Sequence, residues 1–117
     1  IGFPDETREE VQETVTFAKK MKEHGLDHSN FYLVMPVPGT PMFDYCTKNN
    51  HLPLDYNPDR FQWTKANLKN TIISPNELEK IRDQAWESSN NEDFKNLRKS
   101  WAVKSGLKNK ENKSFAV

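Results

Sequence analysis

Few residues of this 117-residue chain have the type and spacing that chemistry requires. His24 and His28 are four residues apart, which on a continuous helix would let both imidazoles bind one metal ion, but Gly25 is typical of a helix end and interrupts the pair. Cys46 is the single cysteine and has no defined base, so packing is preferred over a nucleophilic role. Four early carboxylates form an acidic helix face rather than a general acid–base pair: Glu6, Glu9, Glu10 and Glu13. These side chains alone do not define an active site.

Composition limits the class of protein. Hydrophobic residues make up 34% of the chain and charged residues 29%, and the mean hydropathy of -0.94 is polar for a domain that must bury its own core. The longest apolar run, FYLVMPV, is too short to span a membrane, and no signal peptide is visible. The single cysteine excludes an internal disulfide framework, so we expect a reducing, cytoplasmic compartment and no membrane partner.

Charge is concentrated at the C-terminal end. Residues 95–117 contain seven Lys or Arg and one acid, Glu111, within a chain of zero net charge. Residues 104–117 have no apolar periodicity, so we expect a basic, disordered tail. Such a tail can contact nucleic acid, but no aromatic interleaving or base-reading motif supports that partner, and a solvated terminus is preferred.

The first 50 residues predict a strand, a helix and a second strand. Ile1 to Phe3 resembles the end of a buried strand, and Thr7 with Glu10 forms a capping box that starts a helix ending near Gly25. One face of that helix is apolar: Val11, Val15, Ala18 and Met21. The continuous apolar run from Phe31 to Met35 predicts a strand covered on both faces. A strand–helix–strand unit of this kind predicts two parallel strands with a right-handed crossover.

The remaining residues predict helices separated by an irregular connector. A short helix is expected over 41–48, and residues 51–73 form the connector, with Phe61 and Trp63 as anchors. A second capping box, Ser74 to Glu77, starts a helical extension over 74–103. Its apolar residues fall in two groups: Leu78, Ile81, Ala85 and Trp86, and then Phe94, Leu97 and Trp101.

Two motifs carry a family resemblance. The stretch IGFPDETREEVQETVTFAKKM, followed by FYLVMPVPGTPMFDYC, resembles the C-terminal part of a radical S-adenosylmethionine enzyme core, in the branch of methylthiotransferases and cobalamin-binding-type enzymes. The resemblance covers residues 1–50. It implies an α/β fold, namely a C-terminal fragment of a partial (β/α)6 TIM-like barrel with two parallel strands. The rest of that barrel, N-terminal to this chain, would be its partner.

The resemblance also implies a cofactor site. In the family, S-adenosylmethionine binds a 4Fe-4S cluster and is cleaved reductively to a 5′-deoxyadenosyl radical; a cobalamin domain is left open. The residues implied to line the adenosyl pocket are Ile1, Gly2, Phe3, Met35, Pro36 and Val37. Gly2 would admit the adenosyl group, and the Met35–Val37 segment would contact adenine partly through its backbone. The cluster needs a Cys-x3-Cys-x2-Cys loop, so a chain with one cysteine is expected to be inactive alone.

Two features keep an alternative open. Asp5 stands where the family motif has a glycine, which matters if that position requires a positive φ. The apolar residues of 75–103 and the basic tail also fit a non-catalytic helical interaction module.

Overall fold

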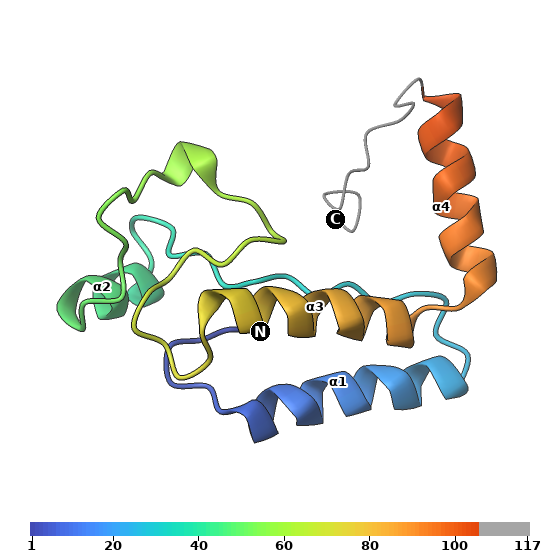
Figure 1. Cartoon of the computed structure of the whole chain (residues 1–117), viewed down its shortest axis with the longest axis horizontal. Helices are drawn as coiled ribbons and strands as arrows, with labels where there is room; N and C mark the ends of the chain where they lie inside the picture. Colours follow the sequence, from blue (N-terminus) through green and yellow to red (C-terminus); the bar gives the residue numbers. More distant parts are fainter. Residues whose placement is uncertain (106–117) are drawn as a thin grey trace.

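The regular structure is helical. The computed structural model describes residues 1–105, which form α1 (Arg8–Glu23), α2 (Pro41–Lys48), a 3-10 turn η1 (Pro58–Arg60), α3 (Pro75–Ser89) and α4 (Glu92–Lys104) (Figure 1). No strand occurs among these residues. The predicted α/β class, a TIM-like barrel fragment with two parallel strands, is therefore wrong. The expected disordered tail falls almost wholly outside the described residues.

The two segments predicted as strands are close together but form no ladder. The ammonium of Ile1 donates to the Tyr32 carbonyl at 2.9 Å, and the Val34 amide donates to the Ile1 carbonyl at 3.1 Å. That is the bonding of a single parallel bridge, with Ile1 opposite Leu33. On the other side, the Leu33 amide donates to the carbonyl of Trp63 in the irregular connector, at 2.8 Å. Pro36 has no amide to extend the pairing.

The apolar run from Phe31 to Met35 indicates burial and not pairing in a sheet. Phe31 and Leu33 are buried in the core, whereas Tyr32 between them is 40% exposed. The expectation of a segment covered on both faces is therefore also wrong. A short extended segment with one buried face satisfies the same sequence pattern.

The helix boundaries follow local signals, which the sequence predicts correctly. The Thr7 hydroxyl caps α1 by accepting from the Glu10 amide at 3.2 Å, and the Ser74 hydroxyl accepts from the Glu77 amide at 3.4 Å. Gly25 has a φ of +99°, and the Leu26 amide reaches back to the Met21 carbonyl at 3.0 Å, which closes α1. Helix α2 has the predicted bounds.

The core lies between α1, α3 and the extended segments. Helices α1 and α3 lie side by side (Figure 1) and bury a shared set of residues: Val11, Val15, Ala18, Phe31, Leu33, Ile73, Leu78 and Ala85. At one end, Arg8 donates two hydrogen bonds to the Glu77 carboxylate, at 2.6 and 2.7 Å. These contacts hold the N-terminal segment against α3.

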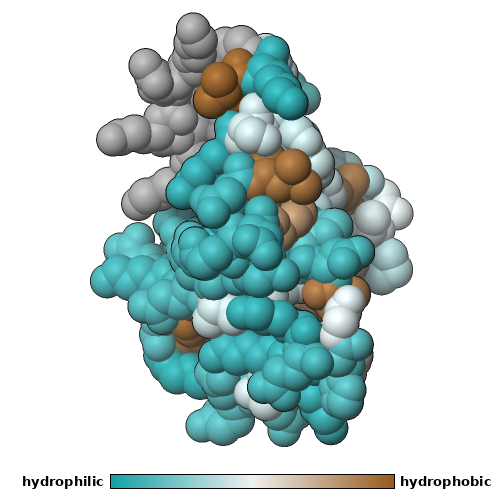
Figure 2. All heavy atoms as spheres, turned by 90° about the vertical axis from the view of Figure 1, so that its right-hand side faces the viewer, coloured by the Kyte–Doolittle hydropathy of each residue, from teal (hydrophilic) through white to brown (hydrophobic). Residues whose placement is uncertain are grey.

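Helix α4 stands apart from this pair. It begins just after the C-terminal end of α3 and points away from that helix (Figure 1). None of the residues of α4 is buried. Figure 2 views the molecule from the α4 side and shows hydrophobic surface between hydrophilic side chains at the height of this helix. No helix among residues 1–105 is both long and apolar enough to cross a membrane.

Candidate functional site

The six residues implied to line an adenosyl pocket differ in accessibility. Gly2 and Pro36 are buried, and Ile1 packs against the core. Met35 is half-buried, while Phe3 and Val37 are 49% and 43% exposed. The bridge between Ile1 and Leu33 brings both segments together, so these residues lie in one region of the chain.

Gly2 is enclosed by protein atoms. Its φ is +94°, and a Cβ added there would lie 2.5 Å from Cδ2 of Leu78 in α3. Its amide donates to the Glu6 carboxylate at 2.6 Å. The cavity beside it, lined also by Leu33, Val34 and Leu78, measures about 10 Å³, room for no more than a water molecule. The structure therefore supplies a packing reason for this glycine.

The carbonyl groups of Met35 to Val37 already accept hydrogen bonds within the chain. The Tyr56 hydroxyl donates to the Pro36 carbonyl at 2.7 Å. The Val37 amide donates to the Met35 carbonyl at 3.0 Å, and the Thr40 hydroxyl donates to the Val37 carbonyl at 2.7 Å. These bonds fix the backbone of the segment. The exposed surface that it offers to a ligand is therefore chiefly that of its side chains.

The turn after Phe3 is tied to α2. The Tyr45 hydroxyl donates to the Asp5 carboxylate, which raises the pKa of Tyr45. Asp5 does not have a positive φ; among described residues other than glycine, only Asn50 and Asn70 do. Replacement of the motif's glycine by Asp5 therefore causes no backbone strain here.

The accessible part of these six residues is apolar. Phe3, Met35 and Val37 offer apolar side chains, which suit the face of an adenine ring. Gly2 and Pro36 are buried and offer no comparable surface. We see no charged side chain among the six that would recognise the sulfonium or the carboxylate of S-adenosylmethionine.

The other candidate residues form no chemical site in the described structure. His24 and His28 are exposed, and His28 stacks on Phe94 with ring centroids 4.6 Å apart. Cys46 is fully buried with its Sγ 3.6 Å from the Met42 sulfur, and burial raises the pKa of its thiol. Within residues 1–105, no group of three or more His, Cys, Asp or Glu side chains is placed to hold a metal ion.

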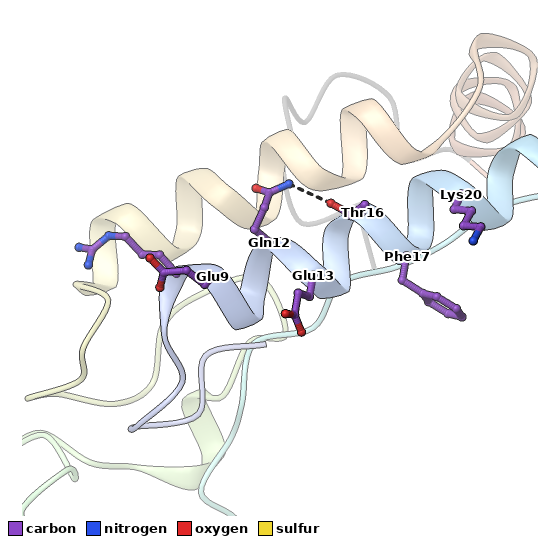
Figure 3. A pocket seen from close by; sticks show the side chains of 7 residues that line it. Glu9, Gln12, Glu13, Thr16, Phe17 and Lys20 are labelled. Carbon is purple, nitrogen blue, oxygen red and sulfur yellow. Dashed lines mark hydrogen bonds between the residues drawn. The ribbon is translucent and has the colours of Figure 1, made fainter.

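A hollow of about 740 Å³ lies on the outer face of α1 (Figure 3). Its walls include Glu9, Glu13, Phe17 and Lys20, and Gln12 donates to the Thr16 hydroxyl at 3.3 Å. All of its lining residues belong to α1, so no second element brings groups together there. The hollow is a helix surface and not a convergent site.

Two buried polar residues that bond the extended segment had not been predicted from the sequence. Arg82, 1% exposed, donates from Nε to the Phe31 carbonyl at 3.0 Å, and Asn90, 2% exposed, bonds both backbone groups of Ser29. Both hold the extended segment against α3 across more than 50 residues of sequence. No local sequence pattern predicts a hydrogen bond over such a separation. A polar residue on an otherwise apolar helix face does indicate that its side chain has a buried partner.

One known protein shares a substantial stretch of this sequence. An uncharacterized methyltransferase from Pyrococcus horikoshii is 50% identical over 52 residues, which is 44% of this chain. The chain is related in part to a methyltransferase. The match spans only 11% of that protein's length. No protein-family model matches the sequence, and no solved structure matches it.

Proposed function

We propose that this chain is part of an S-adenosylmethionine-dependent methyltransferase. The observation that carries the proposal is the 50% identity to the Pyrococcus horikoshii protein described as a methyltransferase. The resemblance of residues 1–50 to enzymes that use S-adenosylmethionine points to the same cofactor. When bound, this cofactor supplies a methyl group from its sulfonium.

In this proposal the chain contributes one apolar side of the cofactor site. Phe3, Met35 and Val37 pack against the adenine, because they are apolar and accessible where Gly2 and Pro36 are not. Tyr56 and Thr40 act as positioning residues, since their hydroxyls hold the carbonyls of Pro36 and Val37. The groups that recognise the sulfonium and the methyl acceptor belong to the rest of the protein.

The finer proposal is that the whole protein belongs to the radical S-adenosylmethionine branch. It rests on the Gly-Phe-Pro and Pro-Gly-Thr-Pro motifs at residues 2–4 and 38–41. A 4Fe-4S cluster would then need three thiolates, of which this chain offers at most one, Cys46. The cluster ligands, and any cobalamin domain, would lie outside these 117 residues.

Methyl transfer and radical cleavage of S-adenosylmethionine give different products, so they can be told apart. The test uses the whole protein that contains this chain, reconstituted anaerobically with iron and sulfide and incubated with S-adenosylmethionine and a reductant. S-adenosylhomocysteine, formed when the methyl group leaves, supports methyl transfer. 5′-Deoxyadenosine and methionine, formed by one-electron cleavage and hydrogen abstraction, support the radical branch. Absence of cofactor binding in equilibrium dialysis would overturn both.

A matched pair of variants tests the contribution of this chain. Val37→Glu places a charge on the apolar side of the proposed site and should weaken S-adenosylmethionine binding about tenfold or more. Leu54→Glu makes the same kind of change at a fully exposed connector residue and should leave the affinity unchanged. Equal affinities for the two variants would exclude this surface from the cofactor site.

The second candidate function is a non-catalytic interaction module. One observation favours it: α4 exposes Leu97, Trp101 and Val103 at 46%, 53% and 58% and buries no residue. A whole protein that neither binds S-adenosylmethionine nor forms its products would favour this candidate.

A further inference from the structure

An exposed carboxylate lies directly beyond the segment that carries Phe3. Asp5 is in a tight turn, which the Glu6 amide closes by donating to the Phe3 carbonyl at 3.1 Å. Two residues along the chain span at most about 7 Å, so Asp5 is a near neighbour of the apolar side chain of Phe3. A charged group therefore borders the proposed cofactor surface, although none of the six residues on it is charged.

Helix α2 holds this carboxylate in place. The Tyr45 hydroxyl donates to Oδ2 of Asp5, and that bond raises the pKa of Tyr45, so the phenol stays protonated and keeps donating. Helix α2 follows the loop that starts at Val37, and its N-cap Thr40 donates to the Val37 carbonyl at 2.7 Å. The bond between Asp5 and Tyr45 therefore ties together the ends of the two segments that supply Phe3 and Val37.

Asp5 keeps acceptor capacity for a ligand. A carboxylate has two oxygens with about four lone-pair sites, and Tyr45 occupies one of them. Within residues 1–105, the Asp5 side chain makes no other hydrogen bond and no ion pair. An acceptor with free sites and a fixed position is suited to recognise hydroxyl groups.

The order of groups in an adenosyl ligand determines which of them meets Asp5. The ribose is joined directly to the adenine, and its 2′ and 3′ hydroxyls are two donors on adjacent carbon atoms. With the adenine packed against Phe3 and Val37, the ribose is the next group along the ligand toward the edge where Asp5 lies. Acidic side chains recognise ribose hydroxyls in the same way in dinucleotide sites.

We propose that Asp5 binds the ribose hydroxyls of the adenosyl ligand and that Tyr45 positions its carboxylate. This inference rests on the proposed S-adenosylmethionine site and names the residue that recognises the sugar there. Asp5 stands where the family motif has a glycine, which has no side chain to make this contact. The contact is thus a property of this chain and not of the motif.

The sulfonium is the other group that a carboxylate attracts, so the test has to separate sugar from charge. S-adenosylhomocysteine carries the same adenosyl group and has no sulfonium. Its 2′,3′-dideoxy analogue lacks the two hydroxyls as well. These two molecules are the probes, and S-adenosylmethionine is the comparison for charge.

Isothermal titration calorimetry of the whole protein that contains this chain measures the dissociation constants. Wild type should bind the dideoxy analogue about tenfold more weakly than S-adenosylhomocysteine. Asp5→Asn keeps an acceptor for Tyr45 but replaces the other oxygen with a donor. It should bind S-adenosylhomocysteine about tenfold more weakly than wild type does, and it should bind the two probes nearly alike.

Two comparisons guard against an effect on folding. Asp55→Asn makes the same change at an exposed residue of the connector and should keep both wild-type dissociation constants. The ratio of the two dissociation constants for one variant does not depend on the fraction of the protein that is folded. Tyr45→Phe removes the positioning bond and should lower the wild-type ratio without changing the charge of the site.

The opposite results identify which inference fails. An Asp5→Asn variant that loses as much affinity for the dideoxy analogue as for S-adenosylhomocysteine would overturn the ribose contact, and so would a variant that loses none. A loss with S-adenosylmethionine but not with S-adenosylhomocysteine would overturn it in favour of the sulfonium. A wild-type protein that binds none of the three molecules would overturn the proposed function itself.

Discussion

At the scale of single residues, Gly2 has two explanations. The family resemblance assigns it to the close approach of an adenosyl group, and that assignment stays a prediction. The structure adds a steric cause, because Leu78 of α3 occupies the space where a side chain would be. Leu78 is 4% exposed, so it has little room to move aside.

Replacement of this glycine should therefore destabilise the fold. For Gly2→Ala we expect a loss of roughly 2–4 kcal/mol in the free energy of unfolding, since a positive φ and an overpacked core both contribute. Gly39→Ala is the control, because Gly39 also has a positive φ (+86°) but has nothing within 4 Å of an added Cβ. It should lose only about 1 kcal/mol in urea unfolding. Equal losses at the two positions would remove the steric explanation.

At the scale of elements, the contact between α1, α3 and the extended segment determines the fold. Its polar anchors are at the two ends of α3. Near the N-terminal end, Arg8 of α1 holds Glu77; just beyond the C-terminal end, Asn90 accepts from the Ser29 amide and donates to the Ser29 and Trp86 carbonyls, all within 2.9 Å.

Loss of the Asn90 amide should be costly. Asn90→Ala leaves the part-buried amide and carbonyl of Ser29 without their partner, and we expect a loss of about 2–3 kcal/mol. Its neighbour Asn91 is exposed and caps α4 through the Phe94 amide at 2.8 Å, so Asn91→Ala should lose only about 1 kcal/mol. Thermal unfolding of both variants makes the comparison. A smaller loss at Asn90 than at Asn91 would contradict the proposed anchor.

The Arg8–Glu77 pair predicts a dependence of stability on pH. The hydrogen bonds from Arg8 lower the pKa of Glu77, so the pair stabilises the folded chain above the ordinary glutamate pKa of about 4.3. That contribution disappears as the pH falls through the lowered pKa of the folded state. Arg8→Met should therefore be less stable than wild type at pH 7, by a small margin because the pair is exposed, and this difference should shrink toward pH 2.

The control is an arginine of similar exposure outside this contact. Arg60→Met, in η1, removes the same charge from another exposed position. Chemical unfolding from pH 7 to pH 2 measures both variants. A difference between Arg8→Met and wild type that does not change with pH would mean that the arginine stabilises by packing and not through Glu77.

At the scale of the whole molecule, stability is unevenly distributed. All residues of the core cluster come from α1, α3 and the segments that lie between them, and none comes from α4. Few buried contacts mean a low free energy of local opening.

Hydrogen exchange should reveal this difference. We expect the amides of α4 to exchange about tenfold or more faster than those of α1 and α3, because α4 buries no residue. Mass spectrometry of peptides from α3 and α4 provides an internal comparison within one sample. Equal protection of the two helices would contradict a weakly held α4.

The sequence by itself determined the helices and their ends. Thr7, Ser74 and Gly25 act through groups three to five residues away, so their effect is present in any context. The sequence also indicated the apolar face of α1, where Val11, Val15 and Ala18 are buried and Met21 is only partly so. It did not determine what lies opposite the run 31–35, because an apolar pattern specifies burial and not a bonding partner.

Only the tertiary structure decided that question. The Trp63 carbonyl, rather than a neighbouring strand, takes the amide of Leu33, and the buried Arg82 reaches the Phe31 carbonyl from 51 residues away. The tertiary structure also decides which residues of the candidate site are accessible. Leu78 fills the space beside Gly2, while Phe3 and Val37 are exposed. Such contacts depend on how α3 packs against the N-terminal segments. The residue spacing within one segment cannot predict these contacts, because their free energy depends on both segments that pack together.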